Sequence, residues 1–140
     1  MENAKIQPRR RSALQIGTTI ARWLMRISGP TAFVLGVLFW TGNALTLIPV
    51  HMLAGIVLIL ALWTLAIVAA VSGVHRGIVA LATIWGLIVP ILGMTQTRLL
   101  PGDAHWVIQV LHLLVGIVAM SLGQGLANRI KQIHTPVQSL

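Results

Sequence analysis

The sequence contains no cysteine, and only two acidic residues, Glu2 and Asp103, stand against ten lysines and arginines. Without cysteine the chain forms no disulfide, holds no zinc or iron–sulfur centre through thiolates, and attaches no c-type haem covalently. Charged residues make up only 9% of the chain, whereas a soluble domain typically has about 25%. So few charges cannot cover a water-exposed surface. The composition therefore excludes a cytosolic globular enzyme and a disordered tail alike.

Four long apolar runs make up most of the 140 residues, of which 56% are hydrophobic. Each run has roughly 18–23 residues, which is about the length that crosses a ~30 Å hydrocarbon core. The sequence therefore predicts an all-α membrane protein with four transmembrane helices, arranged as two repeated hairpins. We expect the four-helix bundle within residues 29–130, with spans at 31–48, 49–71, 78–95 and 104–129. Asp103 is a suitable N-cap for the last span.

The segment before the first span is basic and amphipathic. Apolar residues recur along one helical face between residues 12 and 27, namely Ile16, Ile20, Trp23, Leu24 and Ile27. Residues 1–28 are thus expected to form a basic tail followed by an amphipathic helix in the headgroup layer. Gly29-Pro30 favours a break before the first span, because the residue before proline avoids the helical region. The alternative is that this helix simply extends the first span.

The basic residues are distributed unevenly along the chain. With the N-terminus inside, nine of the ten lysines and arginines lie on the inner side, and Arg98 alone lies outside. This asymmetry predicts cytoplasmic termini in an inner or plasma membrane, with residues 131–140 as a flexible cytoplasmic tail. Because the basic clusters flank apolar runs, they indicate contact with the lipid bilayer and not with nucleic acid.

A short repeat places one histidine in each of two spans. Residues 51–57 read HMLAGIV and residues 112–118 read HLLVGIV, so that five of seven positions are identical. His51 and His112 then belong to spans that run in the same direction, near the outer leaflet. His112 lies nine residues after Asp103, about 13 Å along a helix. The fourth helix must therefore project beyond the membrane by a turn or two for the two histidines to share one depth.

Two neutral imidazoles that face each other in an apolar bundle suit the ligation of a shared metal, and bis-histidine haem ligation satisfies both. Gly55 and Gly116, one turn after each histidine, would let a flat macrocycle approach the backbone. The alternative for each histidine is a hydrogen bond to a hydroxyl or a carbonyl, and for each glycine close helix packing. Arg98 is a candidate partner of haem propionates, and the alternative is that it contacts a lipid headgroup. His105 could contact a propionate, accept a proton or replace a ligand; as a plain surface residue it would do none of these.

These features resemble the small four-helix b-type membrane cytochromes of the cytochrome b-561 kind. The resemblance covers the two histidine-bearing helices and the plan of four spans, about half of the chain. It implies one haem b per chain, with iron bound by His51 and His112. It also implies electron transport to or from a quinone or an outer-face redox protein. Many relatives bind two haems through four histidines, and this chain has only two histidines well inside spans.

Two further functional classes remain open from the sequence. Short loops and the basic N-terminal helix would suit a structural or anchor subunit of a larger membrane complex, or a homo-oligomer. A small multidrug-type proton-coupled transporter is disfavoured, because no carboxylate falls within a span. The first hypothesis is an electron carrier and not an independent enzyme, since bis-histidine ligation leaves no open position on the iron.

Overall fold

Four long helices form the molecule. The computed structural model describes residues 3–134, with the side chains of residues 13–134, and within that part it contains helices and connections but no strand. The helices are α1 (Asn3–Trp40), α2 (Ile48–Val71), α3 (Arg76–Thr95) and α4 (His105–His134), with 3-10 turns η1 (Leu45–Leu47) and η2 (Gln96–Arg98). All four helices are long and apolar enough to cross a membrane. The prediction of an all-α membrane protein is confirmed.

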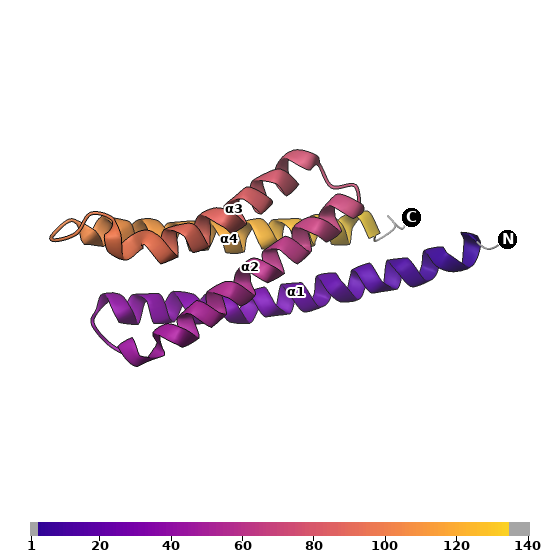
Figure 1. Cartoon of the computed structure of the whole chain (residues 1–140). Coiled ribbons are helices and arrows are strands. Elements are labelled where there is room, and N and C mark those ends of the chain that lie inside the picture. The colour runs from indigo at the N-terminus through magenta and orange to yellow at the C-terminus, as the bar shows by residue number, and fades with distance from the viewer. Residues whose placement is uncertain (1–2, 135–140) are drawn as a thin grey trace, which may run out of the picture.

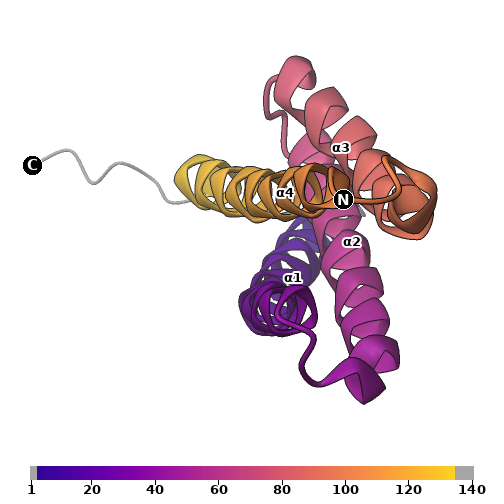
Figure 2. The same ribbon diagram turned by 90° about the vertical axis from the view of Figure 1, so that its left-hand side faces the viewer.

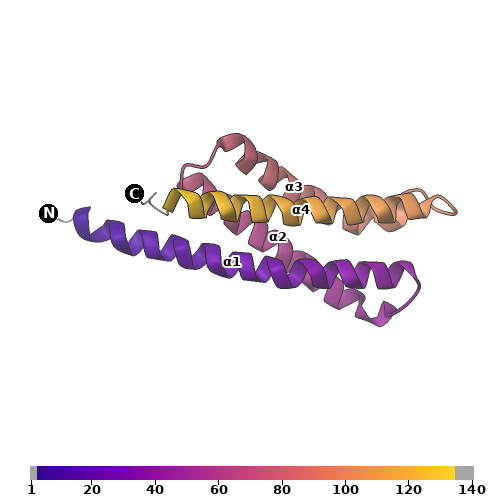
Figure 3. The ribbon, with the colours of Figure 1, turned by 180° about the vertical axis from the view of Figure 1, so that it is seen from behind.

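The helices form two sequential hairpins, α1–α2 and α3–α4 (Figure 1). Figures 1 and 3 show the first and last described turns at the same end as the α2–α3 turn, and the two hairpin connections at the opposite end. Within the described residues, α2 and α4 each pack against all the other helices, whereas α1 and α3 do not touch. Seen from the hairpin connections, α2 crosses the bundle obliquely from α1 toward α3 (Figure 2). The helices α2 and α4 thus form the centre and run in the same direction.

The α3–α4 connection reaches farther than the α1–α2 connection at that end of the bundle (Figure 1). This agrees with the expectation that the fourth helix begins well before the level of His51. Gly102 accepts from the backbone N–H of His105, and Ala104 accepts from that of Val107. Asp103 is therefore not the side-chain N-cap that we expected, because backbone carbonyls meet these first-turn donors.

The centre of the bundle is made by small and aliphatic side chains of α2 and α4. Leu62, Leu65, Ala69, Ala119 and Leu126 are fully buried. Lipid tails are as apolar as these side chains, so helix association in a membrane depends on close packing and on hydrogen bonds between helices. Small residues at the helix contacts allow this close packing.

Two tryptophans supply hydrogen bonds between helices. The Nε1 of Trp63 on α2 donates to the carbonyl oxygen of Thr83 on α3 at 3.2 Å. The Nε1 of Trp85 on α3 donates to the carbonyl oxygen of Val115 on α4 at 2.9 Å. Each bond satisfies an indole N–H that would otherwise lack a partner in an apolar setting. The two tryptophans therefore connect α3 to both central helices.

Helix α1 continues through Gly29-Pro30, so the expected break and the separate amphipathic helix are wrong. The alternative, one helix extending the first span, is what the structure shows. Gly29 is buried where Met120 of α4 enters, and a Cβ at this glycine would lie 2.9 Å from Met120 Cγ. One turn earlier, Met25 lies in the same way over Gly123. This reciprocal contact stabilises α1 across the proline, which transmembrane helices tolerate when neighbouring helices support them.

The apolar face of α1 lies on the outside of the bundle. Five of its residues are 44–63% exposed: Ile16, Ile20, Trp23, Leu24 and Ile27. The opposite face packs inward through Ala21 and Met25. Arg22 is partly buried and donates to Asn128 Oδ1 of α4 at 3.3 Å. The pattern that predicts an interfacial helix thus belongs to a helix packed against α4, with its apolar face available to lipid.

The largest differences from the expected boundaries lie at the two ends of α1 and at the end of α4. The first span ends at Trp40 and not at residue 48, because the chain turns at residues 41–44. Gly42 and Ala44 have φ of 75° and 55° there, and Asn43 lies in this turn and not in a span. Helix α4 continues to His134, so residues 131–134 of the expected tail are helical, while 135–140 lie outside the described residues. Helix α1 begins at Asn3, within the expected tail, and residues 1–2 lie outside the description.

Candidate functional site: a histidine pair between α2 and α4

His51 and His112 lie side by side between the two central helices. Their ring centroids are 6.3 Å apart and the ring planes are inclined at 55°. His51 occupies the first turn of α2, and His112 comes two turns into α4. Because α4 begins farther out, this difference in sequence position brings both rings to one level. The structure thus brings together the two histidines that the repeat singles out.

The ring of His51 is held from the side of α1. Its Nδ1 lies 3.0 Å from the carbonyl oxygen of Ala32, and Phe39 contacts the ring edge-on at 5.4 Å between centroids. A carbonyl only accepts, so this hydrogen bond puts the proton on Nδ1 and leaves the lone pair on Nε2. Metal-binding histidines commonly have this arrangement, with one ring nitrogen donating to a carbonyl and the other free to coordinate.

The ring of His112 has a different environment. Its Nδ1 is buried and has no hydrogen-bond partner among the described residues. The ring lies against Gly93 of α3, where a Cβ would be 3.0 Å from His112 Cε1. A buried polar nitrogen without a partner carries a desolvation cost, which the Nδ1 of His51 avoids through its hydrogen bond to Ala32. The two histidines are therefore chemically unequal.

Four glycines border the pair, and they are of two kinds. Gly36 and Gly93 lie under the rings of His51 and His112, on the first helix of each hairpin. Gly55 and Gly116 have no atom within 4 Å of the position that a Cβ would take. The sequence singled out Gly55 and Gly116, whereas the positions of Gly36 and Gly93 under the rings were not predicted. The available signal was a glycine pair seven residues apart in each first helix, ending in Leu-Gly at 35–36 and 92–93.

The remaining predicted site residues lie at the same end of the bundle. Arg98 is exposed at the end of η2, in the connection before α4. His105 is partly buried at the first position of α4, and its Nδ1 lies 3.2 Å from the carbonyl oxygen of Leu99. It stands seven residues before His112, about 10 Å along the helix. Neither residue forms part of the described contacts of the histidine pair.

The distance between the rings fits one shared metal ion. An imidazole nitrogen binds a first-row metal at about 2 Å, so two rings on opposite sides of one ion have centroids roughly 6 Å apart. No group of three or more His, Cys, Asp or Glu side chains able to hold a metal occurs among the residues described. Two protein ligands suffice for an iron that arrives in a macrocycle supplying the other ligands, as haem does. The free Nε2 of His51 and the open backbone at Gly55 and Gly116 fit that requirement.

Comparison with known proteins gives no match: no family model, no curated protein and no solved structure is significantly similar to the chain. The geometry of the histidine pair is therefore the basis on which a function can be proposed.

Proposed function

We propose that the protein is a membrane haem b protein that transfers single electrons through one bis-histidine haem. The observation that supports this proposal most strongly is the 6.3 Å separation of the His51 and His112 rings between two parallel transmembrane helices. A histidine is rare in such a setting and is functional by default. Two histidines at the spacing of trans ligands make a shared metal the simplest explanation.

Each residue of the site would have a distinct role. His51 would bind through Nε2, with its ring fixed by the carbonyl oxygen of Ala32. His112 would bind from the opposite side, and Gly55 and Gly116 would leave room for the macrocycle beside the helix backbones. When bound, haem supplies reversible one-electron chemistry. If both histidines held the iron, the protein would serve as an electron carrier and not as an oxygen-activating enzyme.

The charge distribution supports a proposed orientation with cytoplasmic termini. Among the described residues, Arg22, Arg26, Arg76, Arg129 and Lys131 lie toward the end with the termini, and Arg98 lies in the connection at the other end. By the positive-inside rule the histidine pair would then lie near the outer leaflet. Arg98 and His105 would be the polar side chains available to the propionates at that side. The redox partner would be a quinone in the bilayer or an outer-face protein.

Replacement of the two histidines tests the proposal. We expect His51→Ala and His112→Ala each to abolish the low-spin haem spectrum of the purified protein, because each removes one axial ligand. His75→Ala and His134→Ala are the matched controls, since these histidines lie at the opposite end of the bundle. An unchanged spectrum in either ligand variant would contradict the assignment. A wild-type protein without haem would leave a structural or anchor role as the simpler explanation.

A further inference from the structure

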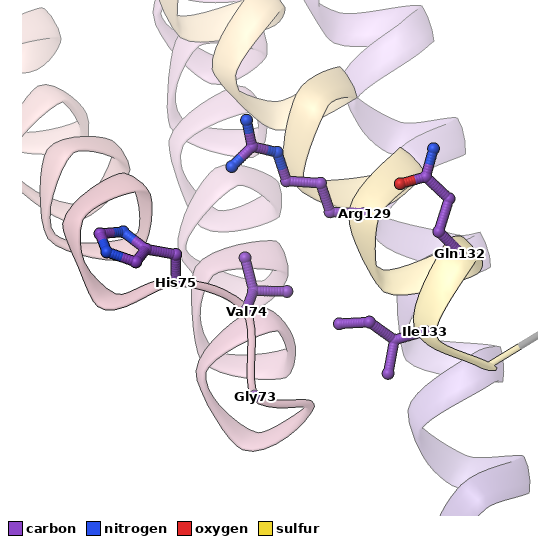
Figure 4. Close-up of a pocket in the computed structure, with 6 residues that line it drawn as sticks. All are labelled: Gly73, Val74, His75, Arg129, Gln132 and Ile133. Atoms are coloured by element: carbon purple, nitrogen blue, oxygen red, sulfur yellow. The ribbon is translucent and has the colours of Figure 1, made fainter.

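A second candidate site lies at the opposite end of the molecule from the histidine pair. An open depression separates the α2–α3 turn from the last turns of α4 (Figure 4). Its lining residues are Gly73, Val74, His75, Arg129, Gln132 and Ile133. In Figure 4, the side chains of Val74 and Ile133 lie between the turn and α4, and the Arg129 side chain extends from α4 above them, away from Gly73. The depression is thus lined by apolar side chains and by one cation, Arg129.

Two residues that line the depression, His75 and Arg129, offer hydrogen-bond donors to an anion. His75 Nδ1 accepts from the backbone N–H of Gly77 at 3.2 Å. Because that nitrogen accepts, the proton of the neutral ring sits on Nε2, which remains available as a donor. Arg129 is exposed and makes no hydrogen bond or ion pair within the described residues. A guanidinium offers five donors in a planar fork that matches phosphate oxygens.

No carboxylate of the described residues can neutralise this end. Asp103 is the only acidic residue described, and it lies in the α3–α4 connection at the far end of the bundle. Arg22, Arg26 and Arg76 lie toward the same end as Arg129. The described part of the chain therefore supplies no carboxylate at this end.

The position of the depression along the bundle indicates that lipid phosphates lie at its level. The bond from Arg22 to Asn128 brings α1 and α4 to one level just beside Arg129. From Arg22 to Trp40, α1 rises by roughly 27 Å, close to the ~30 Å thickness of a hydrocarbon core. The level of Arg22 and Arg129 is thus one boundary of the apolar slab, where lipid phosphates lie.

We propose that the depression binds the phosphate of an anionic phospholipid. The phosphate would accept from Arg129 and His75, while Val74 and Ile133 would contact the apolar part of the same lipid. Basic pockets between transmembrane helices commonly hold such headgroups. Bound there, the lipid would connect the α2–α3 turn to the end of α4. This inference is independent of haem binding.

Native mass spectrometry of the purified full-length chain tests the proposal, with phosphatidylglycerol as the probe and phosphatidylcholine as the neutral comparison. We expect one phosphatidylglycerol to bind preferentially, and Arg129→Gln to weaken that binding roughly fivefold, the effect of one cation near a charged surface. His75→Gln should weaken it less. The matched control is Arg26→Gln, which removes the same charge at the same end, where Arg26 lies against Trp23 and outside the depression.

Three results would overturn the proposal. The first is equal weakening by Arg129→Gln and Arg26→Gln, which would indicate only a general attraction to positive charge. The second is equal binding of phosphatidylcholine and phosphatidylglycerol. The third is displacement of the lipid by millimolar inorganic phosphate, which would identify a site for the free ion. Circular dichroism of each variant establishes that the helices have formed.

Discussion

A hydrogen bond joins Nδ1 of His51 to the carbonyl oxygen of Ala32 at 3.0 Å, whereas Nδ1 of His112 has no partner among the described residues. A partner on the far ring nitrogen fixes a ligand's orientation and raises its basicity, and its loss typically lowers metal affinity 10–100-fold. The two proposed ligands should therefore bind with unequal strength.

This inequality predicts that His51 is the dominant ligand. We expect His51→Gly to weaken haem binding at least tenfold more than His112→Gly, which should retain a five-coordinate, high-spin haem. Titration of each purified variant with haemin, followed by absorbance, measures the two affinities. Added imidazole should restore the low-spin spectrum of the His112→Gly protein. Equal affinities, or stronger binding by the His51→Gly protein, would contradict the predicted order.

The glycines under the two rings should also differ in their tolerance of a methyl group. A Cβ at Gly93 would lie 3.0 Å from His112 Cε1, whereas one at Gly36 would lie 3.6 Å from His51 Cε1, an ordinary contact. We expect Gly93→Ala to displace the His112 ring by a few tenths of an ångström and to shift the electron paramagnetic resonance of the oxidised haem. Gly36→Ala is the matched control and should leave the spectrum unchanged. The prediction fails if the two variants give the same spectrum.

A third glycine should matter for stability and not for haem. Trp63 occupies the space over Gly86, and a Cβ there would lie 3.0 Å from Trp63 Cδ1 while the indole donates to Thr83. Because the indole is rigid, Gly86→Ala should lower the free energy of unfolding by about 1–3 kcal/mol. Thermal unfolding in detergent, followed by circular dichroism, measures this change. Gly125→Ala is the control, since Gly125 has no atom within 4 Å of a Cβ. Equal stability of the two variants would show that the indole moves aside.

The proposed orientation predicts the side of electron exchange. If the histidine pair lies near the outer leaflet, a membrane-impermeant reductant should reduce the haem faster in right-side-out vesicles than in inverted ones. Reduction from the inner side would have to cross roughly 20 Å of the ~30 Å apolar core. Stopped-flow absorbance on the two vesicle preparations compares the rates. Faster reduction in inverted vesicles would reverse the orientation.

Much of the fold could be predicted from apolar length alone. The expected second span, 49–71, agrees with α2 (Ile48–Val71) to within one residue. The agreement is close because Pro49 marks the start of this helix and the turn after Val71 marks its end. Whether the helix breaks at Gly29-Pro30 could not be predicted from the neighbouring residues alone, because α1 is supported there by Met120 of α4, which packs against Gly29. The early end of α1 depends on the turn around Asn43, whose Nδ2 donates to the Thr41 carbonyl at 3.2 Å. That turn is polar but short, and it lies between two apolar segments.

The candidate site was predictable only where the sequence repeats itself. The repeat identified His51 and His112, and a helical rise of 1.5 Å per residue gave their common level. The roles of Ala32, Gly36 and Gly93 depend on how α1 and α3 cross their partners. A backbone carbonyl acceptor has no signature in sequence, so the hydrogen bond that distinguishes the two histidines had to come from the structure.

The haem content of the purified wild-type protein decides whether the histidine pair is a haem site. The protein is produced in haem-replete cells, its pigment is extracted with acid and acetone, and the haem is quantified as its pyridine complex against the protein concentration. We expect about one non-covalent b-type haem per chain, with a low-spin spectrum in the reduced protein. A colourless protein that also fails to take up added haemin would contradict it.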